Sequence, residues 1–181
     1  MKTNATFKSK LKESTDASYI VMDYLRSIGN DITDLTHDND AQTRGMDFLV
    51  NGESVEFKTD LKTHITGNIA FEIVSNVGLG KIGGLLRSEA VWLLYYEIAT
   101  GVCHKISLAA LIDSLQKRGI NQRWQTVIMN TPVGSDKFGY CTMSLLIPLS
   151  FIKNTLSKEA YKIFKVVNNG KPTGLLPDNS Q

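Results

Sequence analysis

Two acidic residues and one lysine flank an Asn-Gly pair in the stretch GMDFLVNGESVEFKTD, residues 45–60. Asn-Gly between two β-like runs is a strong signal for a two-residue hairpin turn. With this pair as the turn, Asp47 lies directly opposite Glu56, where paired Cβ atoms are about 4.5–5.5 Å apart. Lys58 projects from the same strand face as Glu56, because side chains alternate along a strand. The hairpin therefore predicts two carboxylates and one ammonium group in one place.

Two facing carboxylates repel each other and destabilise a hairpin unless positive charge compensates them. A divalent cation supplies that charge, and hard oxygen ligands suit Mg²⁺, with Mn²⁺ as a substitute. Lys58 would offset part of the charge and orient an attacking water or help to deprotonate it. This chemistry is metal-assisted hydrolysis of a phosphodiester bond. The alternative is an exposed strand face on which Glu56 and Lys58 are ordinary surface charges.

The composition places these residues in a globular domain. The chain has 181 residues, of which 42% are hydrophobic and 21% charged, and its net charge is +2. The longest apolar run, AVWLLYY, is far shorter than the roughly 20 residues of a membrane helix. The N-terminus lacks the apolar segment of a secretory signal. Two isolated cysteines and three scattered histidines indicate neither a zinc site nor a Ser-His-Asp triad. We expect a cytoplasmic protein with no membrane partner.

The elements that must position the hairpin follow an α/β order. Apolar residues at helical spacing predict a helix over about 14–28 that ends at Gly29, and the polar residues after it predict mostly loop up to residue 45. Ser107 is predicted to cap a helix that ends at Gly119. A further helix is predicted to begin near Ser150 or Ser157. The predicted β-like runs are 46–50, 54–58, 68–74, 90–98, 102–106 and 140–149.

These elements predict a single α/β domain with a mixed, mostly antiparallel central sheet flanked by helices. We expect this domain to span residues 13–168, after a basic N-terminal arm at 1–12 and before a flexible tail at 169–181. The arm carries four lysines, Lys10 among them, which are either DNA contacts or solvated charges.

Asp47, an eight-residue spacer and Glu56-Phe57-Lys58 together resemble the D-Xn-(D/E)-X-K signature of the PD-(D/E)XK nuclease superfamily, whose fold is restriction-endonuclease-like. Residues 66–97 are similar to a segment of small phage-encoded members, with a GN…E strand and a glycine-containing connector. The resemblance covers roughly residues 13–106. It implies that Asp47 and Glu56 bind Mg²⁺, that the Phe57 carbonyl is a further ligand, and that Lys58 is the catalytic lysine.

Other residues are candidates with open alternatives. Holliday-junction resolvases of the superfamily place a further glutamate on the first helix, where Glu13 is the best match and Asp16 its competitor. Asp60 follows the site on the same strand and belongs either to the site or to a turn. Glu72 either flanks the metal or is a polar residue on the wetter face of a strand. The sequence has Met46 where the superfamily commonly has proline.

DNA contacts are expected from Lys81 and Arg87, which border the glycine-rich connector at 78–88 and are otherwise surface charges. Trp124 is a better candidate for base stacking than Trp92 or its neighbouring tyrosines, which read as core.

The resemblance implies a magnesium-dependent endonuclease that hydrolyses DNA, in phage DNA processing or recombination, including cleavage of branched junctions. A symmetric DNA substrate would favour a homodimer. The alternatives are a nuclease-fold module that binds nucleic acid without cleaving it and a phage interaction or inhibitor protein. The sequence does not separate DNA from RNA as the substrate.

Overall fold

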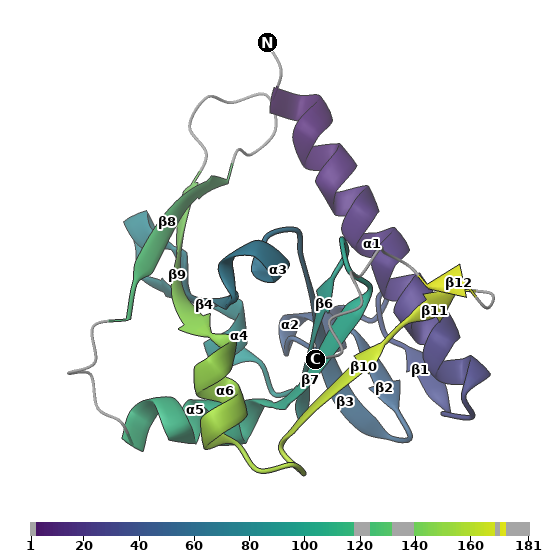
Figure 1. Ribbon diagram of the computed structural model, residues 1–181. Helices are drawn as coiled ribbons and strands as arrows, with labels where there is room; N and C mark the ends of the chain where they lie inside the picture. The colour runs from purple at the N-terminus through teal and green to yellow at the C-terminus, as the bar shows by residue number, and fades with distance from the viewer. Residues whose placement is uncertain (1–2, 118–123, 132–139, 169–170, 173–181) are drawn as a thin grey trace.

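The computed structural model describes residues 3–117, 124–131, 140–168 and 171–172 (Figure 1). Within these ranges, only the backbone is described for 3–13, 130–131, 168 and 171–172.

A six-stranded sheet forms the centre of the fold, in the order β1-β2-β3-β6-β7-β10. β3 and β6 are parallel, and all other neighbours in this sheet are antiparallel. Its strands are β1 (Ile32–Asp34), β2 (Phe48–Val50), β3 (Glu53–Asp60), β6 (Trp92–Glu97), β7 (Val102–Ser107) and β10 (Tyr161–Lys165). The predicted mixed, mostly antiparallel sheet in a single α/β domain is confirmed.

A second, fully antiparallel sheet has the order β5-β4-β9-β8. Its strands are β4 (Asn68–Asn76), β5 (Lys81–Ile82), β8 (Thr126–Thr131) and β9 (Tyr140–Pro148). Two short strands, β11 (Val167–Asn168) and β12 (Lys171–Pro172), pair with each other. The helices are α1 (Thr3–Ser27), α2 (Asn39–Thr43), α3 (Thr63–Thr66), the 3₁₀ turn η1 (Val77–Leu79), α4 (Gly84–Arg87), α5 (Leu108–Lys117) and α6 (Leu149–Thr155).

Two hydrophobic cores cover the two faces of the central sheet. The first lies under α1 and includes Val21, Phe48 and Phe57. The second lies between the opposite face, with Leu93 and Tyr95, and the four-stranded sheet with α4, α5 and α6. Figure 1 shows this arrangement, with α1 along one side and the four-stranded sheet on the other. The middle of β3, residues 55–57, is therefore buried.

Two sequence predictions near the N-terminus were wrong. The first helix begins at Thr3, so that residues 3–12, expected to be an arm, are helical; this stretch contains no glycine or proline to stop the helix. The expected loop over 31–45 contains both β1 and α2. β1 forms because it pairs with β2, and α2 is capped by the Asp38 carboxylate, which accepts the N–H groups of Asp40 and Ala41 at 3.0 Å.

Later elements agree better with the sequence. The predicted strands at β4, β6, β7 and β9 are confirmed, as is α5 after Ser107, while the end of that helix at Gly119 lies outside the described residues. β8 and β10 were not predicted. The expected tail at 169–181 is described only at β12. In the described part of the chain, no helix is long and apolar enough to cross a membrane.

A buried polar chain joins three strands of the central sheet. Glu97 Oε1 lies 2.9 Å from His104 Nε2, and His104 Nδ1 lies 2.9 Å from the Tyr161 hydroxyl. Because a carboxylate only accepts, Nε2 carries the proton and Nδ1 accepts from Tyr161. Burial lowers the pKa of His104, although the hydrogen bond to Glu97 acts in the opposite direction. The histidine is therefore held neutral between β6 and β10.

This chain predicts acid sensitivity of the fold. The unfolded chain binds a proton at His104 near pH 6.5, whereas the folded chain resists protonation until a lower pH. The free energy of unfolding should therefore fall as the pH drops below about 6.5, by at most about 1.4 kcal/mol per pH unit. Urea unfolding at pH 7.5 and 5.5 measures this change. A His104→Gln variant should lose that part of the pH dependence, and the exposed His64→Gln should keep it; equal pH dependence in all three proteins would contradict the assignment.

Candidate active site

The hairpin that carries the candidate residues has the predicted turn and register. Phe48 pairs with Val55, and the residues between them follow in order up to the turn. Asn51 and Gly52 both have positive φ, 51° and 82°. Positive φ at both central positions is what a type I′ turn requires. The Asn-Gly signal therefore fixed the reversal that brings β2 back along β3.

Asp47 lies one residue before β2 and outside the ladder, so it does not form the direct backbone pair with Glu56 that the sequence predicted. Its N–H donates to the Val55 carbonyl at 2.8 Å, and its Oδ2 accepts the Phe57 N–H at 2.7 Å. Its Oδ1 accepts from Gln42 Nε2 at 3.3 Å. The carboxylate has taken the place of a backbone acceptor, which fixes it beside β3.

Glu56 is buried, with 3% of its surface exposed. Its Oε1 forms an ion pair with Lys58 Nζ. Its Oε2 is buried and has no hydrogen-bond partner among the described residues. A Cβ on Gly45 would lie 2.5 Å from this oxygen and 2.9 Å from Ser88 Oγ. A buried, half-satisfied carboxylate is costly, which marks Glu56 as more than a structural side chain.

The Lys58 ammonium group interacts with three carboxylates, those of Glu56, Asp47 and Glu72. Burial is the largest influence and disfavours the ammonium form, but the charge and hydrogen bond of Glu56, together with the charges of Asp47 and Glu72, outweigh it, so that the pKa of Lys58 is raised. Its side chain is 42% exposed. Lys58 therefore stays protonated and is suited to stabilising negative charge, and the expected role in deprotonating water is not favoured.

A cleft of 410 Å³ opens at this site and is lined by three of the predicted residues, Asp47, Phe57 and Lys58. Glu56 does not line the cleft, but it forms an ion pair with Lys58, which does. The other walls are polar and come from α1, from the loop after β1 and from α2. They consist of Ser14, Thr15, Ser18, Tyr19, Thr36, His37 and Gln42. The cleft is thus a hydroxyl-rich space with an ammonium group and a carboxylate in its wall.

The helix residues proposed to complete the site have different outcomes. Glu13 lies in α1 directly before Ser14, which lines the cleft, but the Glu13 side chain is outside the described residues. Asp16 is exposed and does not line the cleft. α1 thus lines the cleft beside this position, and the role of Glu13 stays a prediction.

Asp60 and Glu72 are now distinguishable. Asp60 accepts the N–H of Thr63 at 2.7 Å and the Tyr95 hydroxyl at 2.9 Å, and it also accepts the N–H of Lys62. It is therefore a turn-forming residue at the start of α3. Glu72 accepts the Gly84 N–H at 2.9 Å, and its charge acts on Lys58. Glu72 belongs to the electrostatic surroundings of the site.

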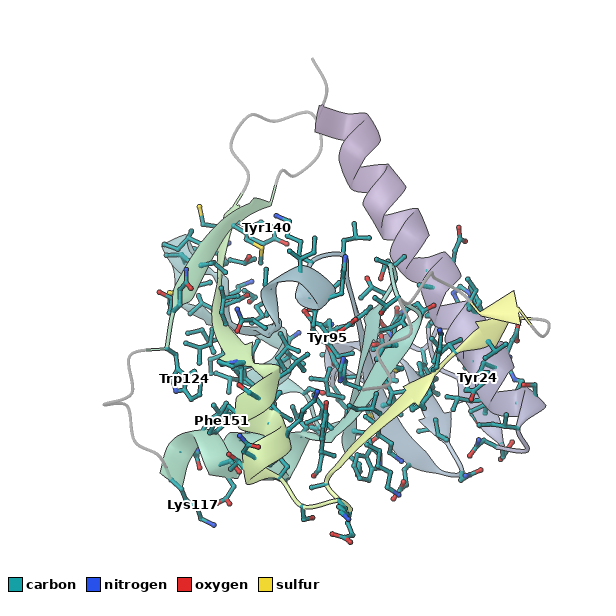
Figure 2. The ribbon with its side chains drawn as sticks, viewed as in Figure 1. Tyr24, Tyr95, Lys117, Trp124, Tyr140 and Phe151 are labelled. Carbon is teal, nitrogen blue, oxygen red and sulfur yellow. The ribbon has the colours of Figure 1, made fainter. Side chains whose placement is uncertain are left out.

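The expected DNA contacts are spread over the surface. Lys81 and Arg87 are exposed, on β5 and α4, and neither lines the cleft. Lys10 lies in α1, with its side chain outside the described residues. Trp124, the better of the candidates for base stacking, packs edge-on against Phe151, with ring centroids 4.9 Å apart and an interplanar angle of 71° (Figure 2). That packing places Trp124 against the second core.

Sequence reasoning missed two residues that shape the site, Gln42 and Ser88. Gln42 donates to Asp47 Oδ1 and to the carbonyls of Leu35 and Met46, so it holds the carboxylate against two loop segments. Ser88 Oγ donates to the Gly45 carbonyl at 2.8 Å and fixes the loop over Glu56. No local sequence pattern predicts these contacts. Gly45, two residues before Asp47, is the one local signal, because glycine allows other groups to approach the backbone closely.

The donor set fits a hard cation in two respects. Carboxylate oxygens are the ligands that Mg²⁺ and Mn²⁺ prefer, and one oxygen of Glu56 is left without a hydrogen bond. In the described part of the chain, no three Asp, Glu, His or Cys side chains form a metal-binding group. Comparisons with protein families, with curated proteins and with solved structures found no match to this chain. The case for function therefore depends on the geometry of the site.

The contact between Gly45 and Glu56 predicts an unusually costly substitution. Gly45→Ala places a methyl group against Glu56 and Ser88 at a residue with φ of 68°. Gly67 is a matched control, because its φ is 67° and nothing lies within 4 Å of an added Cβ. Gly67→Ala should cost about 1–2 kcal/mol of unfolding free energy from the backbone alone.

Gly45→Ala should cost at least about 1 kcal/mol more than Gly67→Ala, because the carboxylate or the serine must move. Chemical denaturation of both variants measures the difference. Equal losses would show that the space beside Glu56 is not tightly filled.

Proposed function

We propose that this chain is a divalent-metal-dependent endonuclease that hydrolyses phosphodiester bonds in DNA. The observation that carries the proposal is the convergence of Asp47 and Glu56 on the protonated Lys58 beside an open polar cleft. One buried Glu56 oxygen lacks a hydrogen bond in the described part of the chain, which supports a role for this carboxylate beyond the ion pair. The resemblance of these three residues to the PD-(D/E)XK signature points to the same chemistry.

Asp47, Glu56 and the backbone carbonyl of Phe57 are the groups that would hold Mg²⁺ or Mn²⁺. The chemistry such an ion supplies is Lewis-acid stabilisation of negative charge at the phosphoryl group. Gln42 and the Phe57 N–H keep the Asp47 carboxylate oriented before any ligand arrives. Orientation of this kind lowers the cost of assembling the site.

Lys58 acts on the phosphate as a fixed positive charge. Lys58 lines the cleft and its ammonium group stays protonated, so it is available to stabilise the charge that develops on the phosphoryl oxygens during attack by water. Ser14 and Tyr19 on α1 supply hydroxyl groups for sugar and phosphate oxygens on the opposite wall. Such contacts position the strand without reading its sequence.

The biological setting follows from the resemblance. We place the activity in the cytoplasm, in phage DNA processing or recombination, with branched DNA as one candidate substrate. A homodimer would present two such clefts to a symmetric junction.

A binding module without activity is the second candidate. Glu56 is 3% exposed and does not line the cleft, whereas Lys58 does. This arrangement would suit a site that binds a phosphate group at Lys58 without cleaving nucleic acid.

A substrate panel tests the proposal against this alternative. Duplex, branched and single-stranded DNA and RNA are incubated with Mg²⁺, Mn²⁺ or EDTA, and products are resolved on gels. The wild-type chain should cleave at least one DNA substrate with either metal and none in EDTA. Asp47→Asn, Glu56→Gln and Lys58→Met should each lose about 100-fold or more in cleavage rate, because the first two remove a carboxylate charge proposed to hold the metal ion and the third removes the positive charge proposed to stabilise the phosphoryl oxygens.

Glu53→Gln is the matched control for these variants. Glu53 lies on the same strand as Glu56 but is exposed, and its carboxylate accepts from Trp92 Nε1 at 2.8 Å. It should keep near wild-type activity. Retarded migration of DNA without cleavage would favour the binding module, and a chain that neither binds nor cuts nucleic acid would favour an interaction protein.

A further inference from the structure

Glu56, one of the two carboxylates proposed to hold a metal ion, is already paired with Lys58. Lys58 Nζ contacts Glu56 Oε1, the carboxylate oxygen nearer to the lysine that lines the cleft. The other oxygen lies beside Gly45 and Ser88 and has no hydrogen-bond partner among the described residues. An ion that enters from the cleft therefore meets the ammonium group before it meets Glu56.

We propose that the Lys58 ammonium is the resident counter-ion of this site and that a divalent cation binds Glu56 only by displacing it. The inference rests on the proposed metal-dependent function and adds a competition between the chain's own cation and the incoming one.

Electrostatic repulsion makes Lys58 and a divalent ion compete for Glu56. A buried carboxylate such as Glu56 is strongly destabilising without a positive partner, and Lys58 is the partner that the structure supplies. Two cations in contact with one carboxylate oxygen repel each other strongly in a partly buried site. The ammonium and a divalent ion therefore exclude each other at Glu56 Oε1.

The surroundings of Lys58 leave the displaced group a place to go. Its side chain is 42% exposed and lines the cleft, so it can turn toward the cleft without unpacking the core. Glu72, held by the Gly84 N–H at 2.9 Å, attracts the ammonium from β4 independently of Glu56. One lysine would thus stabilise the metal-free chain and, once displaced, face the phosphate of the substrate.

Calorimetric titration of the full chain with Mn²⁺ tests the exchange. Lys58→Met removes the competing charge but none of the oxygen ligands, so it should bind Mn²⁺ about tenfold or more tightly than the wild-type chain. The matched control is Lys62→Met, which removes an exposed lysine four residues later and should leave the affinity unchanged. Equal or weaker binding by Lys58→Met overturns the proposal, as does the absence of Mn²⁺ binding by both chains.

Lys58→Met leaves Glu56 buried without a counter-ion, so its folding must be checked by circular dichroism. Lys58→Gln, which keeps a hydrogen-bond donor without the charge, should show the same tighter binding if the methionine variant does not fold.

The wild-type chain offers an independent readout in the ¹⁵N NMR signal of the Lys58 ammonium. This signal should shift on addition of Mg²⁺, and an unchanged signal at saturating Mg²⁺ overturns the exchange. A chain with the predicted affinities that cuts no nucleic acid supports the exchange and contradicts the nuclease. A chain that cuts DNA while Lys58→Met binds Mn²⁺ no more tightly contradicts the exchange alone.

Discussion

The buried carboxylate of Glu56 is the constraint on which the rest of the site depends. It lies on β3, between two hydrophobic cores, where an ionised group is tolerated only beside a positive charge. Lys58 supplies that charge from two residues along the same strand face. The loop above the carboxylate has a glycine at 45 because no side chain fits there, and Ser88 holds that loop in place. Stability requires Glu56 to stay paired with Lys58, whereas the proposed chemistry requires Glu56 to bind a metal ion.

The strands of the central sheet hold Glu56 and Lys58, and the loop residue directly before β2 supplies Asp47. β3 has its hairpin partner β2 on one side and its parallel partner β6 on the other, so its position is fixed. Asp47 lies directly before β2, where the chain enters the strand, and its side chain replaces a backbone acceptor for Phe57. α1 covers one core and lines the cleft with its exposed edge.

The parts of this arrangement that the sequence predicted are those set by local signals. The Asn-Gly turn determined the hairpin register, and the alternation along β3 placed Lys58 with Glu56. β1 was missed because it is short and pairs with β2, which lies further along the chain, and α2 was missed because it has only five residues. The hydrogen bonds from Gln42 to Asp47 and from Ser88 to Gly45, 43 residues away, are contacts that no local sequence pattern predicts. The direct pairing of Asp47 with Glu56 failed because a side-chain acceptor replaced a backbone one.

The central claim is that Asp47 and Glu56 hold a divalent ion beside Lys58. Anomalous diffraction from a crystal soaked in Mn²⁺ tests it most directly, because the signal locates the ion without assuming any activity. The account predicts a peak within bonding distance of both carboxylates, with Lys58 Nζ no longer in contact with Glu56. An anomalous map with no peak at these carboxylates, and with the Glu56–Lys58 pair intact at saturating Mn²⁺, would contradict it.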